Sequence, residues 1–263
     1  FKPFIKGRNV LPYVIEYSGE YIHYKSENEK LYTNQAFREK EIFEQEKLIT
    51  RQILGNKIIT SFDDTYLYTD QTTYVILKKH EYSDLFKLLC VLNSKLMYFY
   101  FLNTFSDNKK TFPKVKRSQL LKIPVPENGL NFYKFSDTQI RQINKFRNET
   151  SNFLNLLQSK YEIDKFSTKL QNWYELDFKQ FIAELKKKKV VLTLSEEAEW
   201  MSYFNEKKAE AQELKAKIEA TDNEIDLMVY KLYDLTYDEV LIVDPETSIS
   251  REVYGGCVRV KKH

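Results

Sequence analysis

The sequence predicts an α+β protein. A mixed, mainly antiparallel β-rich head with a buried helix comes first, and a C-terminal helical section with a long heptad-patterned helix follows. Three observations support this prediction. Residues 1–82 alternate turns with short runs rich in Thr, Tyr, Val and Ile, as is typical of strands. An apolar run covers residues 85–102, and from residue 136 apolar side chains recur at helical spacing.

The expected strands of the head have period-two patches and are separated by turns at Gly19, Gly55 and Asp63-Asp64. They are Tyr13–Tyr17, Tyr21–Tyr24, Lys57–Phe62, Thr65–Thr69 and Thr72–Lys79.

The apolar run Leu85–Leu102, which begins after Ser83, predicts one buried helix. It contains two lysines and an asparagine and is shorter than the apolar stretch that usually spans a membrane, so no membrane partner is expected. Residues 104–126 predict a basic loop and then a short strand. Pro124 and Pro126 end that strand and mark a domain boundary.

The helical section shows three helix starts. Ser136–Gln139 and Thr236–Glu239 have the spacing of capping boxes, and Ser195 precedes two glutamates that suit the first turn of a long helix. Residues 166–189 predict one or two further helices.

The long helix carries apolar and polar residues at alternating spacings of three and four, which is a heptad seam. Its members are Phe204, Lys207, Ala211, Leu214, Ile218, Thr221, Ile225, Met228 and Leu232. Two interpretations remain open. The seam packs within the chain against the helix that starts at Ser136, or it forms a coiled-coil contact with another domain or chain. The expected domains are a head (1–126), a helical section (127–244) and an unpatterned tail (245–263).

Charge is distributed unevenly along the 263 residues. The formal net charge is +3, but residues 1–125 have 20 Lys and Arg against 14 Asp and Glu, so the first half is the basic one. A local field of this kind attracts anionic partners. The two cysteines, Cys90 and Cys257, form no disulfide framework, so we expect a reducing, cytoplasmic setting. Because the chain begins with Phe, we expect a fragment of a longer protein.

Several kinds of chemistry lack their motifs in this sequence. The six glycines are never spaced as GxG, there is no Pro-Pro, and three scattered histidines give no metal-ligand spacing. Acidic-x-Lys triplets such as Asp107–Lys109 are no more frequent than composition alone produces. We therefore assign no catalytic, cofactor-binding or metal-binding residue and expect the fragment itself not to be an enzyme.

Five segments, in order, resemble the TaqI-type C-terminal specificity domain, which is the target recognition domain of type IIG restriction-modification enzymes and adenine-specific DNA methyltransferases. They are Lys2–Tyr13, Lys47–Asp64, Leu88–Phe101, Phe112–Pro126 and Glu224–Val243.

The resemblance implies a module that reads double-stranded DNA beside a methyltransferase domain of the same polypeptide. That domain would use S-adenosylmethionine, and some such enzymes also carry a nuclease domain. The half-units of type I specificity subunits share the strand-then-helix plan, and a phage-defence methyltransferase without nuclease activity would have the same architecture.

DNA reading requires cations for phosphates and side chains that reach base edges: an Arg fork for guanine, and Gln or Asn for adenine. The candidate DNA contacts lie in three loop regions. They are Lys6, Arg8, Asn9, Arg51, Gln52, Asn56, Lys57, Tyr66, Tyr68, Gln71, Lys109, Lys110, Lys114, Lys116 and Arg117.

Each candidate has a structural alternative. Arg51 would pair with Glu46 or Asp63, and Tyr66 and Tyr68 would pack on one strand face rather than stack on an extruded base. The run Lys186–Lys189 is better explained as a solvated helix end than as a phosphate contact. The alternative function is a protein-interaction module that uses the heptad helix and the tyrosine-rich sheet. Salt dependence of binding distinguishes the two functions.

Overall fold

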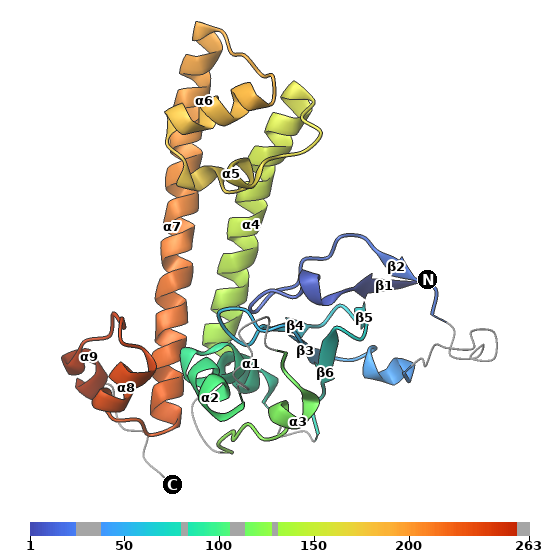
Figure 1. Cartoon of the computed structure of the whole chain (residues 1–263), viewed down its shortest axis with the longest axis vertical. Coiled ribbons are helices and arrows are strands. Elements are labelled where there is room, and N and C mark those ends of the chain that lie inside the picture. Colours follow the sequence, from blue (N-terminus) through green and yellow to red (C-terminus); the bar gives the residue numbers. More distant parts are fainter. Residues whose placement is uncertain (25–37, 80–83, 106–113, 128–130, 257–263) are drawn as a thin grey trace. The chain divides into compact units, whose positions relative to one another are not determined.

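The computed structural model describes residues 1–24, 38–79, 84–105, 114–127 and 131–256 (Figure 1). It is an α+β structure, as the sequence predicts, with two small sheets in the N-terminal part and long helices afterwards. The strands are β1 (Lys2–Ile5), β2 (Tyr21–Ile22), β3 (Lys47–Arg51), β4 (Thr60–Asp63), β5 (Tyr68–Thr69) and β6 (Thr73–Ile76). Short 3₁₀ helices lie at Gly7–Asn9 (η1), Lys40–Ile42 (η3) and Trp173–Glu175 (η4).

The helices fall before and after the predicted boundary at residue 126. They are α1 (Leu85–Asn93), α2 (Lys95–Phe105), α3 (Arg117–Leu120), α4 (Tyr133–Tyr161), α5 (Thr168–Gln171), α6 (Phe178–Lys187), α7 (Leu194–Leu232), α8 (Tyr237–Val243) and α9 (Arg251–Gly256).

The structure divides into two compact units. Unit 1 contains residues 1–138 and 222–263, and unit 2 contains residues 139–221. The expected division was sequential, at residue 126. In the structure, residues 127–138 and the last turns of α7 with α8 group with the head instead. The tail, for which the sequence shows no pattern, contains the short helix α9.

Each sheet of unit 1 has three strands. In the first, β1 pairs with β2 antiparallel and with β5 parallel, in the order β2-β1-β5. In the second, β3 is central and antiparallel to both neighbours, in the order β4-β3-β6. Leu48 and Ile49 of β3 are fully buried, and Leu48 lies opposite Phe62 on one side and Ile76 on the other. The head is thus mixed but mainly antiparallel, as expected.

The strand positions differ from the predicted ones in detail. The strands β1 and β3 are absent from the predicted set, and the predicted strand Tyr13–Tyr17 is reduced to two isolated bridges. The reason is local. Tyr13 has a positive φ of 69°, so the chain turns there instead of continuing as a strand. The other predicted strands are present but shorter at one or both ends.

The single helix predicted after the sheet is two helices. The chain bends by 67° between α1 and α2, at Ser94. Asp84 caps α1 by accepting from the Lys87 amide at 2.9 Å, while the predicted start, Ser83, lies outside the described residues. Ser94 accepts from the Met97 amide at 3.2 Å and so caps α2. A small polar residue inside an apolar run ends one helix and starts another.

Among the residues that the structure describes, no single helix has the length and apolarity to cross a membrane. Only α1 and α2 taken together meet both criteria, across their bend. Leu89, Cys90 and Val91 of α1 are fully buried within unit 1.

Two predictions at the boundary were wrong. The segment before Pro124 forms the short helix α3 rather than a strand, and the Lys116 amide donates to Gln119 Oε1 at its start (2.8 Å). The capping box at Ser136 does not form, because α4 already begins at Tyr133. The Ser136 hydroxyl instead donates to the Phe132 carbonyl at 3.0 Å.

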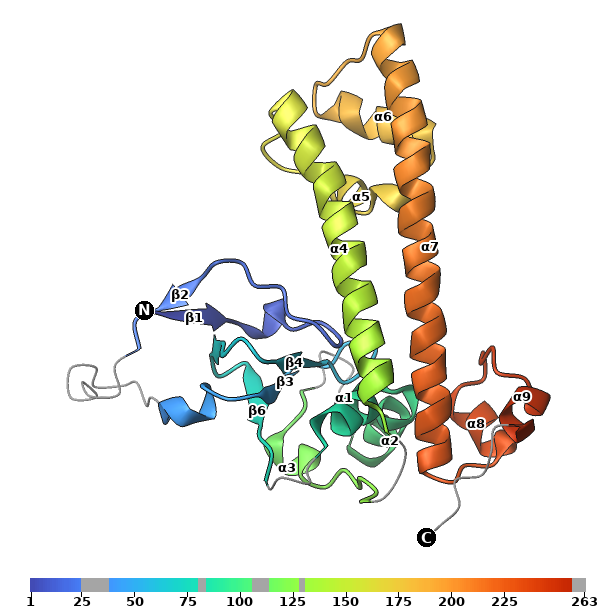
Figure 2. The same cartoon turned by 180° about the vertical axis from the view of Figure 1, so that it is seen from behind.

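Unit 2 has its own aromatic core between α4 and α7, with α5 and α6 packed beside them (Figures 1 and 2). Phe153 of α4 stacks on Trp173 at a centroid distance of 3.8 Å, and Phe181 of α6 stacks on Phe204 of α7 at 4.7 Å. The Trp173 indole donates to the Thr150 carbonyl (3.2 Å). The predicted helices in residues 166–189 are therefore confirmed.

The heptad seam of α7 packs within the chain. Phe204 and Ala211 share the unit 2 core with Leu157 of α4. Thr221 donates to Gln142 of α4 (3.0 Å), which explains a polar residue on the seam. The helix begins one residue before the predicted start, and Thr193 forms its capping box with Glu196. The capping box at Thr236 is confirmed at the start of α8.

Candidate nucleic-acid interface

Four segments of the chain meet at one end of the sheet β4-β3-β6. Because β3 is antiparallel to both neighbours, its last residue, Arg51, lies beside the first residues of β4 and β6. The amide of Gln52 donates to the Thr72 carbonyl (2.9 Å), and its side-chain amide donates to the Gln71 carbonyl (2.5 Å). The loop from Gln52 to Ile59, here called the β3–β4 loop, therefore starts alongside the turn that precedes β6.

The opening segment of the chain reaches the same turn. The Gly7 amide donates to the Thr72 hydroxyl at 2.8 Å. A Cβ at Gly7 would lie 2.8 Å from that oxygen, which is too close, so only glycine allows this approach. The contact brings η1, with Arg8 on its surface, next to Thr72.

The basic segment after α2 contacts the β3–β4 loop at the same end of the sheet. Lys114 forms an isolated antiparallel bridge with Ile53, and the Val115 amide donates to the Gln52 carbonyl (2.8 Å). Val115 is buried, whereas Lys114, Lys116 and Arg117 are exposed. Ile53 and Lys114, which are 61 positions apart in the sequence, thus lie on one surface. We call it the rim and define it as Arg8, Arg51, Gln52, Asn56, Gln71, Lys114, Lys116 and Arg117.

Most cations of the rim are available to an anion. Within the described part of the chain, Arg51, Lys114, Lys116 and Arg117 take part in no ion pair. Arg51 pairs with neither of its two expected partners, because Glu46 contacts Lys78 (3.4 Å) and Asp63 contacts Lys47 (2.5 Å).

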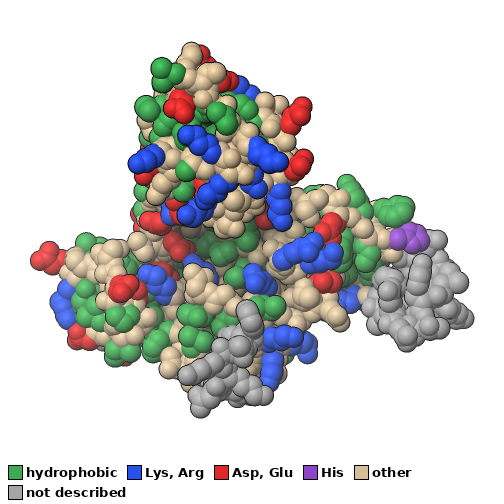
Figure 3. Space-filling model, turned by 45° about the horizontal axis from the view of Figure 1, so that its top comes forward, with side chains coloured by type: hydrophobic (Ala, Val, Ile, Leu, Met, Phe, Trp, Pro, Cys, Tyr) green, Lys and Arg blue, Asp and Glu red, His purple; other side chains and the backbone are tan. Residues whose placement is uncertain are grey.

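Arg8 differs from those four cations, because it shares Glu20 with Lys6. The two Glu20 contacts are 2.7 Å from Arg8 and 2.8 Å from Lys6, and the Lys6 hydrogen bond together with Arg8 holds the pKa of Glu20 below its ordinary value. Figure 3 likewise shows lysine and arginine side chains next to acidic ones on the visible face.

Five of the described candidates do not join the rim, and Lys6, which pairs with Glu20 (2.8 Å), is one of them. Asn9 and Tyr68 are buried, with 5% and 2% of their surface exposed. Asn9 donates to the Glu16 carbonyl (2.9 Å), and the Tyr68 hydroxyl donates to Glu44 (2.9 Å), so both side chains serve the interior of the head. Lys57 is largely buried in an ion pair with Asp222 (2.9 Å).

Tyr66 is exposed but lies at the opposite end of the sheet. Its ring centroid is 6.0 Å from the ammonium of Lys47, which begins β3. Its φ of 62° places it outside the strand, so it does not share a face with Tyr68 as the spacing suggested. Lys109 and Lys110 lie outside the described residues.

Sequence reasoning did not identify Ile53, which is 36% exposed in the middle of the rim. An apolar side chain there suits contact with a thymine methyl group. Its exposure depends on the bridge to Lys114, so no local signal marks it in the sequence.

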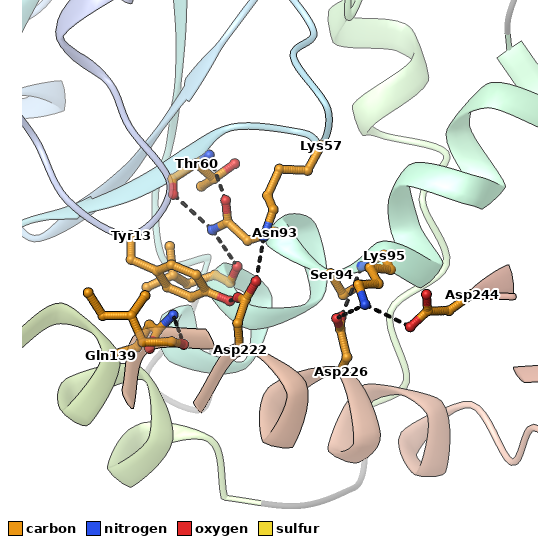
Figure 4. Close-up of polar contacts among 12 residues, drawn as sticks. Tyr13, Lys57, Thr60, Asn93, Ser94, Lys95, Gln139, Asp222, Asp226 and Asp244 are labelled. Atoms are coloured by element: carbon orange, nitrogen blue, oxygen red, sulfur yellow. Dashed lines mark hydrogen bonds and ion pairs between the residues drawn. The ribbon is translucent and has the colours of Figure 1, made fainter. Parts of the chain in front are cut away.

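The far end of the β3–β4 loop is anchored inside unit 1 (Figure 4). The Asn93 side chain accepts from the Thr60 amide (3.2 Å) and donates to the Thr60 carbonyl (2.8 Å). The Asp222 carboxylate of α7 contacts both Lys57 (2.9 Å) and the Tyr13 hydroxyl (3.3 Å).

One turn further along α7, Asp226 accepts from the Lys95 amide at the start of α2 (2.9 Å). Lys95 also pairs with Asp244 (2.7 Å). Burial raises the pKa of Asp226 to about 7, against the lowering effect of the Lys95 hydrogen bond. Asp226 is therefore a buried carboxyl group of unit 1 whose pKa lies near neutral pH.

The described residues contain no group of three or more His, Cys, Asp or Glu side chains placed to hold a metal ion. The rim carries side chains of two chemical kinds: lysine and arginine cations of the type that bind phosphates, and amide and guanidinium groups of the type that bond base edges.

Two family models match the chain. Residues 126–229 match a domain described only as of unknown function, and comparison with curated proteins finds no match. Residues 2–125 match the TaqI-like C-terminal specificity domain, which supports a DNA sequence-specificity role in a restriction-modification context. The predicted resemblance is confirmed for the β-rich N-terminal part: residues 2–125, which include all of the rim, match the TaqI-like C-terminal specificity domain, while the fifth resembling segment, Glu224–Val243, lies outside the match.

Proposed function

We propose that the chain is a non-catalytic module that recognises a specific sequence in double-stranded DNA, and that the rim is the surface that reads it. The observation that carries this proposal is the convergence of four chain segments on one sheet end. Amide side chains and cations, four of which have no ion-pair partner among the described residues, lie together there, although they come from residues 8 to 117 of the sequence.

The rim residues divide into two roles. Lys114, Lys116 and Arg117 are exposed cations on a short segment and suit phosphate oxygens, which set affinity and salt dependence. Arg51 and Asn56 lie in or beside the β3–β4 loop, with side chains suited to guanine and adenine edges in the major groove. Affinity therefore belongs mainly to the first group and sequence preference mainly to the second.

The parent protein is, in this proposal, an adenine-specific DNA methyltransferase whose catalytic domain binds S-adenosylmethionine. It belongs to a type IIG restriction-modification or phage-defence system and acts in the cytoplasm. The support is the match of residues 2–125 to a specificity domain of restriction-modification enzymes.

The test is selection from a randomised duplex library by the 263-residue chain at about 50 mM and about 200 mM salt, a range over which phosphate contacts weaken steeply. We expect enrichment of a short sequence and a steep salt slope. Arg51→Gln should relax the preference at one base pair by about 1–3 kcal/mol. The matched control is Lys78→Gln, an exposed cation at the opposite end of β6. Equal loss of preference in both variants would contradict the assignment.

If the chain binds no DNA at either salt concentration, the protein-interaction alternative is favoured instead. That alternative uses the heptad helix and the tyrosine-rich sheet. Seam residues of the heptad helix, such as Phe204 and Thr221, already contact α4 within the chain, which argues against the first of these surfaces. Its remaining basis is the exposed tyrosines of the head, Tyr17, Tyr21 and Tyr66.

A further inference from the structure

The β3–β4 loop has two very different ends. Its first residue, Gln52, is fixed by three hydrogen bonds within the rim, and Thr60, just beyond it, is held by Asn93 in both directions. Between them, Ile53, Gly55 and Asn56 are exposed. Leu54 and Ile58 are buried, and the Gly55 amide donates to the Lys57 carbonyl (3.2 Å), so the exposed stretch closes on Lys57.

Lys57 is held by one carboxylate. Its side chain is only 16% exposed, and its ammonium lies 2.9 Å from Asp222 of α7. An ammonium in such a position is stable only while it is paired. Without Asp222, Lys57 would reach its lowest free energy by turning toward water, and the neighbouring residues of the loop would move with it.

The same carboxylate also holds the segment that follows η1. The Tyr13 hydroxyl donates to Asp222 (3.3 Å), and the Tyr13 amide donates to the Thr60 carbonyl (2.9 Å). Tyr13 is buried and has a left-handed backbone conformation, which needs tertiary contacts to persist. Asp222 therefore links two of the segments that lead into the rim, although it lies outside residues 2–125.

We infer that Asp222 is a positioning residue for DNA sequence recognition: its ion pair with Lys57 and its hydrogen bond from Tyr13 fix the β3–β4 loop, so that Asn56 and Ile53 are presented to the bases in one geometry. The inference rests on the proposed function of the rim. It assigns no DNA contact to Asp222 or to Lys57. It assigns to Lys57 a role inside the protein, in place of the DNA contact that the sequence predicts.

The test compares Asp222→Ala, Asp222→Asn and the charge-swapped pair Lys57→Asp/Asp222→Lys in the 263-residue chain. Asp222→Ala removes both contacts, Asp222→Asn keeps an acceptor but loses the charge, and the swapped pair restores opposite charges. The control is Asp238→Asn, which removes the charge of an exposed ion pair. Asp238 lies 2.6 Å from Arg251, and the two side chains are 75% and 65% exposed.

We expect Asp222→Ala to lower the preference for the selected sequence over the randomised pool at least about 5-fold, the lower limit for one base contact. Asp222→Asn should give a smaller loss, and the swapped pair should recover part of it. The salt slope should stay unchanged, because no phosphate contact is removed. A purely structural role would instead weaken binding to all sequences equally and leave the preference intact, and that result would overturn the inference.

Hydrogen exchange provides a readout that needs no DNA. Amides of residues 53–57 should exchange faster in Asp222→Ala than in the unsubstituted chain, while Gln52 and Thr60 keep their protection. Unchanged exchange in this stretch would overturn the inference. If the unsubstituted chain binds no DNA, the proposed function fails, and hydrogen exchange alone decides whether Asp222 positions the loop.

Discussion

Asp226 makes the stability of unit 1 depend on pH in an unusual direction. Burial raises its pKa to about 7, whereas an unfolded aspartate titrates near 4. The native state therefore binds the proton more tightly than the unfolded state, and the stability that this proton contributes is lost as pH rises from about 4 through about 7. At about 1.4 kcal/mol per pKa unit, roughly 2–3 kcal/mol of unfolding free energy should disappear between pH 5 and pH 8.

Asp226→Asn should remove this dependence, because an asparagine oxygen still accepts from the Lys95 amide but carries no proton to release. Urea unfolding of both proteins at pH 5 and pH 8 measures the difference. Glutamates with lowered pKa values, such as Glu184 and Glu196, lose their contribution only below about pH 4.5 and so do not obscure the window. Identical slopes for the two proteins would show that Asp226 is ionised throughout.

The ion pair between Lys47 and Asp63 is the most deeply buried one at the sheet. Both side chains are at most 1% exposed and their charged atoms are 2.5 Å apart. Lys47→Met leaves the Asp63 charge buried with only hydrogen-bond donors around it, and we expect a loss of about 3–5 kcal/mol in unfolding free energy. Lys78→Met, at an exposed pair with Glu46, should cost at most about 1 kcal/mol. Denaturant titration of both variants provides the comparison, and a Lys47 variant as stable as the Lys78 variant would refute the prediction.

At the scale of elements, the proposed function assigns the phosphate contacts of the rim to the segment from Lys114 to α3. Replacing Lys114, Lys116 and Arg117 together by Gln should weaken binding to all duplexes similarly and reduce the salt slope by about 1 per residue removed. The sequence preference of the remaining binding should persist. Replacement of Lys186, Lys187 and Lys189 at the end of α6 is the matched control, since Lys187 already pairs with Glu184 (2.6 Å). A slope that changes in the control instead would move the phosphate contacts to unit 2.

At the scale of the whole molecule, the two units have separate cores and should lose protection separately. Phe204 is completely buried among aromatic rings of unit 2, so Phe204→Ala should cost about 3–5 kcal/mol. Hydrogen exchange should then accelerate mainly within residues 139–221, while β3 keeps its protection. Met201→Ala, at a 46% exposed site on the same helix, serves as the control. Equal acceleration in β3 would show that the two cores unfold as one.

Local chemistry explains which elements the sequence predicts well. The capping box at Thr236 forms because its two partners, Thr236 and Glu239, lie within four consecutive residues. The helices of residues 166–189 likewise follow the apolar spacing of their own segment. The capping box at Ser136 does not form, because α4 begins three residues earlier, where the Tyr133 amide donates to the Asn131 side chain (2.9 Å).

The sequence by itself determined the fold class, the basic first half, the specificity-domain resemblance and the residue types suited to DNA, because each depends on composition or on neighbours along the chain. Only the tertiary structure decided which of those residues share a surface. Val115 pairs with Gln52 and Gly7 with Thr72 through contacts between distant segments. The same long-range packing buries Asn9 and Tyr68 and turns Lys57 toward Asp222. Exposure and pairing are properties of the packed chain, and no local pattern encodes them.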